Sequence, residues 1–217
     1  MRNAILIITF TALVLFIVFG ILYGLFRTPT KLNEQEMASV SEVQDKTNSA
    51  FNEEDVRSIF SKLWYDHVRL TREVILGIFR NSPDVTAKEN ELLDNQTDIG
   101  NAINMFYPQS ASIITSTLRD HILQAKVILE DLKFKRLAKL PADINRWYDN
   151  ADKFADIMNE INPAWNLKEH MEEHLRITER EAVYEWLGAK ELSSKIYNEK
   201  VVPQAQEIAE IIVRGLK

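Results

Sequence analysis

Three short stretches decide the fold: Leu63-Trp64-Tyr65-Asp66-His67-Val68, Thr117-Leu118-Arg119-Asp120-His121-Ile122 and His170-Met171-Glu172-Glu173-His174-Leu175. In each stretch an apolar residue stands three positions before a histidine, an acidic residue directly before it and an apolar residue directly after it. The histidines are 54 and 53 residues apart. Because matches at a nearly constant interval are the signature of repeated architecture, the sequence predicts an internal repeat of about 54 residues.

A second signature follows each histidine and centres on a side-chain amide: Asn95, Asn150 and Gln204, which are 55 and 54 residues apart. Apolar residues recur three positions before, four after and eight after the amide, and a small residue stands five after it. The apolar set is Leu92, Trp147, Val201, Ile99, Phe154, Ile208, Ile103, Met158 and Ile212, and the small set is Gly100, Ala155 and Ala209. This spacing is that of one helical face, and the small residues predict a close approach of two helices.

The two signatures predict an all-α fold, a six-helix bundle of three helical hairpins. Pro108 and Pro163 follow the second helix of the first two hairpins, Pro141 suits a first helical turn, and Gly188 suits a helix end. Only six glycines and six prolines occur, which fits helices better than a sheet. We expect helices at 54–80, 87–105, 109–137, 142–160, 166–187 and 190–215, in repeats 54–108, 109–163 and 164–217.

The chain before the bundle predicts a membrane anchor. Residues 4–26 contain 23 residues without a charge, which as a helix is about 35 Å long, enough to cross a bilayer core. A cleaved signal peptide is the alternative, but Gly24-Leu25-Phe26-Arg27 lacks a small-x-small cleavage site. We therefore expect a transmembrane signal anchor at 1–27, a polar stalk at 28–51 and the bundle domain at 52–217, on an undetermined side of the membrane. Gly20 and Gly24 could bring two such anchors together in a homo-oligomer.

Composition excludes several classes of function. The chain has 26 basic and 32 acidic residues and a formal charge of -6, which argues against nucleic acid as a partner. It has no cysteine, so disulfides and thiolate sites are excluded. No phosphate-binding glycine loop, nucleophile elbow or zinc-binding helix motif occurs. We predict no catalytic residue, and enzymatic activity is not the favoured reading.

The three histidines and three amides admit two readings. As a structural layer, each buried imidazole would pair with an amide or a hydroxyl, and Thr71 and Thr178 stand one helical turn after their histidines. As a metal site, His67, His121 and His174 would converge on a transition metal, with Asn95, Asn150 and Gln204 orienting them. Asp66, Asp120 and Glu173 point away around the helix and are expected at the surface.

Four segments carry a resemblance: Leu-Trp-x-x-His-x-x-x-Thr-Arg (63–72), Trp-Tyr-x-Asn-Ala-Asp (147–152), Asn-Pro-x-Trp (162–165) and His-Leu-Arg-x-Thr-Glu-x-Glu-Ala-Val (174–183). Together they resemble a family of small all-helical proteins of unknown function, known mainly from Gram-positive bacteria. The resemblance covers about residues 60–215 and implies a helical bundle without an assigned activity. We expect a membrane-anchored structural or protein-interaction module; the alternative is a membrane-tethered, three-histidine metal-binding protein with a redox, sensory or hydrolytic role.

Overall fold

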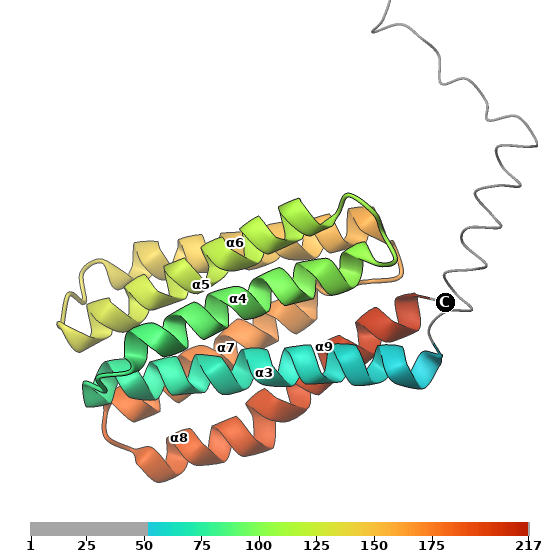
Figure 1. The fold of residues 1–217 in the computed structure, drawn as a ribbon. Helices are drawn as coiled ribbons and strands as arrows, with labels where there is room; N and C mark the ends of the chain where they lie inside the picture. Colours follow the sequence, from blue (N-terminus) through green and yellow to red (C-terminus); the bar gives the residue numbers. More distant parts are fainter. Residues whose placement is uncertain (1–51, 217) are drawn as a thin grey trace, which may run out of the picture. The chain divides into compact units, whose positions relative to one another are not determined.

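Six helical rods run up and down beside one another in the part of the chain that the computed structural model describes, residues 52–216 (Figure 1). The rods are α3 Glu53–Arg80, α4 Val85–Asn104, α5 Ala111–Lys133, α6 Leu140–Ile161, α7 Lys168–Trp186, and a last rod formed by α8 Lys190–Ile196, η1 Tyr197–Val201 and α9 Val202–Gly215. No strand occurs in this part of the chain, so the predicted all-α class is confirmed. None of the helices described is long and apolar enough to span a bilayer. The anchor predicted at 1–27 and the stalk predicted at 28–51 lie outside the described residues.

Each rod packs against its neighbours in the sequence, and α9 packs against α3, so the rods close into a ring. The first helices of the three hairpins, α3, α5 and α7, also contact one another. They therefore meet in the middle of the bundle, with α4, α6 and the last rod at its outside. This arrangement gathers the faces that carry the three histidines.

The helix ends follow local chemistry. Asn52 caps α3, since its side-chain oxygen accepts a hydrogen bond from the Asp55 amide at 2.9 Å. Pro141 lies in the first turn of α6, and Gly188 follows α7 with a φ of 77°, as their residue types predict. The helix expected at 109–137 instead ends at Lys133. The helix ends there because Lys135 adopts a left-handed φ of 56°. Glycine is the usual residue at such a position, so no residue type in the sequence signals this helix end.

The last rod differs from the continuous α-helix expected at 190–215. Residues Tyr197–Val201 form one turn of π-helix, and α9 begins directly after them with Pro203 in its first turn. Proline has no amide donor, and its ring clashes with the carbonyl four residues earlier, so an uninterrupted α-helix would be strained here. The π turn widens the backbone before Pro203 and lets the rod continue.

The core contains the stripe that the sequence indicated. All nine apolar positions of the amide signature are buried at 4 % exposure or less. Gly100 lies where two helices approach: a Cβ placed on it would overlap Thr115 Oγ1 and come within 3.0 Å of the Ala111 carbonyl oxygen. The close contact between α4 and α5 therefore depends on the absence of a side chain at Gly100.

Candidate functional site

The three histidines of the signature lie inside the bundle. His67 on α3, His121 on α5 and His174 on α7 are 3, 3 and 2 % exposed. The imidazole ring centroids of His67 and His174 are 5.7 Å apart. The sequence therefore identified a buried set of polar residues that the central helices bring together.

An amide bridges each histidine to the backbone of its own helix. In the second hairpin, Asn150 Oδ1 lies 3.0 Å from His121 Nδ1, and Asn150 Nδ2 donates to the Thr117 carbonyl at 3.1 Å. In the third hairpin, Gln204 Oε1 lies 3.1 Å from His174 Nδ1, and Gln204 Nε2 donates to the His170 carbonyl at 2.7 Å. Both carbonyls belong to the residue four positions before the histidine. One amide side chain therefore bonds both the imidazole and a backbone carbonyl of the neighbouring helix.

In the first hairpin two amide side chains make the two contacts that a single amide makes in the other hairpins. Asn95 Nδ2 donates to the Leu63 carbonyl, again four residues before the histidine, at 3.1 Å. Gln96 Nε2 lies 3.3 Å from His67 Nδ1 and 2.5 Å from the Leu92 carbonyl. Gln96 is completely buried. Sequence reasoning missed it, because the equivalent positions of the other two hairpins, Ala151 and Ala205, carry no amide.

These contacts fix the tautomers of two histidines. A carbonyl only accepts hydrogen bonds, so the NH₂ ends of Asn150 and Gln204 must face the backbone and their oxygens must face the imidazoles. His121 and His174 therefore donate through Nδ1–H, and their Nε2 atoms carry no proton in the neutral ring. His67 differs, because the NH₂ group of Gln96 faces its Nδ1 and makes that nitrogen an acceptor.

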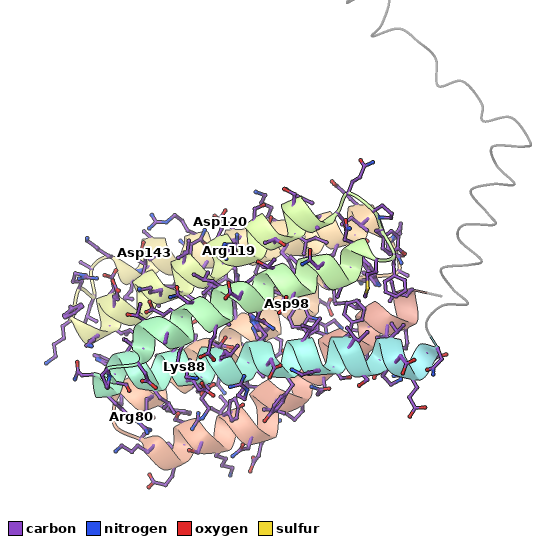
Figure 2. The ribbon with its side chains drawn as sticks, in the orientation of Figure 1. Arg80, Lys88, Asp98, Arg119, Asp120 and Asp143 are labelled. Atoms are coloured by element: carbon purple, nitrogen blue, oxygen red, sulfur yellow. The ribbon has the colours of Figure 1, made fainter. Side chains whose placement is uncertain are left out.

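The threonines do not pair with the imidazoles as we had considered. Thr71 Oγ1 donates to the backbone carbonyl of His67 at 2.8 Å, a contact within the helix. Thr178 Oγ1 is buried and has no hydrogen-bond partner among the described residues. Amides alone therefore hold the imidazoles. Asp120, directly before His121, is exposed on α5 as expected (Figure 2).

Burial keeps the histidines neutral. It lowers the pKa of His121 to about 3 and that of His174 to about 4, against an ordinary value of 6.5. It also lowers the pKa of His67, and the neighbouring His174 and His121 add to that shift because like charges repel. His67 and His121 thus lie close enough to a neighbouring imidazole for its charge to affect their protonation.

Within residues 52–216, no group of three or more His, Cys, Asp or Glu side chains comes together closely enough to hold a metal ion. His170, the other histidine of α7, lies 3.9 Å from Glu207 and is separate from the buried rings. In the arrangement described, the imidazoles are held by amides rather than grouped as a ligand set.

A second buried polar cluster was not foreseen from the sequence. Arg72 on α3 forms an ion pair with Glu181 on α7, donates to Ser194 Oγ at 3.0 Å and lies 4.6 Å from the ring centroid of Tyr197. Glu181 is 1 % exposed, and burial raises its pKa to about 7 even though Arg72 donates to it. Nearby, Arg80 pairs with the buried Glu185 at 2.8 Å. The cluster joins α3, α7 and the last rod.

The segment Asn162–Trp165 fastens the end of the chain. Asn162 Nδ2 donates to the Gly215 carbonyl at 2.5 Å and to the Tyr107 hydroxyl at 2.7 Å. Trp165 is fully buried, and its Nε1–H donates to the Ile212 carbonyl at 2.9 Å. These bonds satisfy carbonyls in the last turn of α9, which the helix itself leaves without partners.

Comparison with known proteins gives no match: no family model, no curated protein and no solved structure is similar to this chain. The resemblance to the Gram-positive helical family therefore stays a prediction. The structure nevertheless shows contacts made by residues of the four segments that carry the resemblance. Arg72 and Glu181 stand in two different motifs and pair across the bundle, and Asn150 of a third motif holds His121.

Proposed function

We propose that this protein is a membrane-anchored helical module with a structural or protein-interaction role. The observation that carries the proposal is that several residues of the motifs make contacts that hold the bundle together. His121 is bonded to Asn150, Arg72 to Glu181, and Trp165 to the end of α9. Because these contacts lie inside the bundle, the residues available to a partner are those of the surface.

The surface of α5 supports an interaction role. Leu123 and Val127, one helical turn apart, are 48 and 42 % exposed. Leu123 also lines a hollow of about 240 Å³ between α3, α4 and α5, whose walls include Leu92, Ile122 and Leu129. An exposed apolar turn beside an apolar hollow is the kind of surface that a partner helix or loop fills.

The test is a site-specific photocrosslink in the membranes of cells that express the full chain. A photoreactive amino acid at Leu123 is expected to give a discrete adduct, and Val127→Asp, which charges the same face, is expected to abolish it. The same photoreactive group at Asp149, an exposed position of α6, is the matched control and should give none. Equal labelling from both positions would contradict the interaction role. Resistance of the chain to alkaline carbonate extraction tests the anchor separately.

We also infer that the bundle is a triplicated hairpin. The inference is supported by the amides Asn95, Asn150 and Gln204, each of which donates to the carbonyl four residues before a buried histidine. A contact this specific, recurring in three hairpins at intervals of about 54 residues, has a simple origin in a duplicated unit.

A metal-binding role is the second candidate, because the ring centroids of His67 and His174 are 5.7 Å apart and His121 lies close enough to contribute to the lowered pKa of His67. It requires the rings to turn from their amides toward a common ion. Elemental analysis of the full chain, purified without chelators, tests it against His121→Ala. About one transition metal per chain, lost in the variant, supports it; a metal-free protein whose variant is only less stable refutes it.

A further inference from the structure

The end of the bundle opposite the N-terminus of α3 is here called the distal end (Figure 1). Apolar side chains are exposed there in the α5–α6 loop and around the junction of α7 and α8. Phe134 and Leu137, between α5 and α6, are 59 and 49 % exposed. Leu187 and Leu192, between α7 and the first turn of α8, are 64 and 49 % exposed. The two most exposed large apolar side chains among residues 52–216 thus lie at the same end of the molecule.

The α5–α6 loop of the distal end is basic, in a chain that is acidic. Residues 133–139 contain four basic residues and no acidic one, which leaves 22 basic against 32 acidic residues in the rest of the chain. Lys133, Lys135 and Lys139 form no ion pair with any described residue, whereas Arg136 pairs with the buried Asp131. Charge and exposed apolar surface therefore coincide in one short loop.

Basic side chains at the α5–α6 loop lie on either side of Phe134 in the sequence and contact its ring. Lys133 Nζ lies 5.7 Å and the guanidinium carbon of Arg136 5.2 Å from the centroid of the Phe134 ring, within the range of a cation–π contact. Lys135, Leu137 and Lys139 follow and are all exposed. An aromatic and an aliphatic side chain surrounded by cations form the pattern that enters the headgroup region of a bilayer.

We propose that the distal end binds an anionic lipid surface, with Phe134 and Leu137 entering the headgroup region and Lys133, Lys135 and Lys139 facing the lipid phosphates and carboxylates. A bilayer fits this surface better than an acidic protein does. The apolar side chains stand at the tips of two loops at one end, and a fluid interface accepts such tips without a matching pocket. Unpaired lysines near an anionic leaflet each strengthen binding about fivefold at low ionic strength.

The inference does not depend on the predicted anchor. If residues 1–27 hold the chain in the membrane, the distal end adds a second contact that requires anionic lipid. If they do not, the distal end alone still binds anionic vesicles and leaves neutral ones. Binding to neutral vesicles therefore tests the anchor. The additional binding of the distal end to anionic vesicles, compared with neutral ones, tests the proposal made here.

The chain contains no cysteine, so single cysteines can carry a fluorophore that reports water or lipid. We would label full-length Leu137→Cys with an environment-sensitive dye and add it to phosphatidylcholine vesicles with and without about one third phosphatidylserine. The expected result is a blue shift and a gain in intensity with phosphatidylserine only. Ile113→Cys is the matched control, since Ile113 is a similarly exposed apolar residue at the other end of the bundle, and its dye should not respond.

A triple variant, Lys133→Gln with Lys135→Gln and Lys139→Gln, separates charge from folding because all three side chains are at the surface and lack ion pairs. We expect it to retain its helical circular dichroism and, with the dye at position 137, to shift the equilibrium between lipid-inserted and water-exposed dye on anionic vesicles about a hundredfold toward water, whether or not the anchor is inserted. An unchanged dye spectrum at position 137 when phosphatidylserine is added, or the same dye response in the triple variant as in the wild type, would overturn the proposal. Binding of an acidic protein at Leu137 without any response to lipid would overturn it as well.

Discussion

Removing the amide of Asn150 should destabilise the bundle by about 1.5–3.5 kcal/mol. Asn150→Ala leaves the His121 Nδ1–H buried without an acceptor, which costs about 1–3 kcal/mol, and it also removes a hydrogen bond to the Thr117 carbonyl worth about 1 kcal/mol. The higher helix propensity of alanine returns about 0.5 kcal/mol. The loss follows from an unsatisfied group rather than from lost apolar area.

The assay is urea unfolding of the full chain in detergent, followed by circular dichroism. Asn145→Ala is the control, because Asn145 is an exposed residue of the same helix, and its free energy of unfolding should stay within about 0.5 kcal/mol of the wild type. In the double variant His121→Leu with Asn150→Ala, both partners are gone, so we expect part of the stability to return. If Asn150→Ala unfolds like the control, the histidine and amide layer does not hold the bundle together.

Three further outcomes follow from the same structure. Since the pKa of His121 is lowered to about 3, the unfolded chain binds a proton below the ordinary value of 6.5 that the folded chain does not, and stability falls with pH below 6.5. Between about pH 7.5 and pH 5, urea titrations should show that His121→Gln loses about 2 kcal/mol less than the wild type. Arg72→Met should cost about 3–5 kcal/mol by leaving the Glu181 carboxylate buried and unpaired, and Arg72→Met with Glu181→Met should recover most of it in thermal unfolding. Gly100→Leu should lower the free energy of unfolding by about 3 kcal/mol or more, since even its Cβ would overlap Thr115, and wild-type stability in the variant would refute the close approach.

Periodicity predicted most of the fold because the same apolar spacing recurs in three places. The histidines and two of the three amide bridges could be anticipated for that reason, since Asn150 and Gln204 occupy equivalent positions and make equivalent contacts. Gln96 could not, because only the first hairpin divides the bridge between two amides.

The features that the sequence did not predict have two physical causes. The end of α5 depends on the left-handed backbone conformation of Lys135, which lysine rarely adopts and which its residue type therefore does not predict. The pair of Arg72 with Glu181 joins residues 109 positions apart, and each looks like an ordinary charge in its own helix. Contacts made between distant helices by residues of common type leave no periodic trace in the sequence.

The π turn at Tyr197–Val201 makes the last rod two helices with independent registers. A π turn holds one more residue than the α turn it replaces, so the helix before it is rotated by about 100° relative to a regular continuation. Ser193 and Ser194 thereby face Arg72, while Ile208 and Ile212 stay in the core beside α3. Deleting one residue here would restore a regular helix and leave both halves facing their present neighbours, whereas adding a residue would rotate one half by about 100°. The last rod should therefore tolerate the loss of one residue at the π turn better than the gain of one.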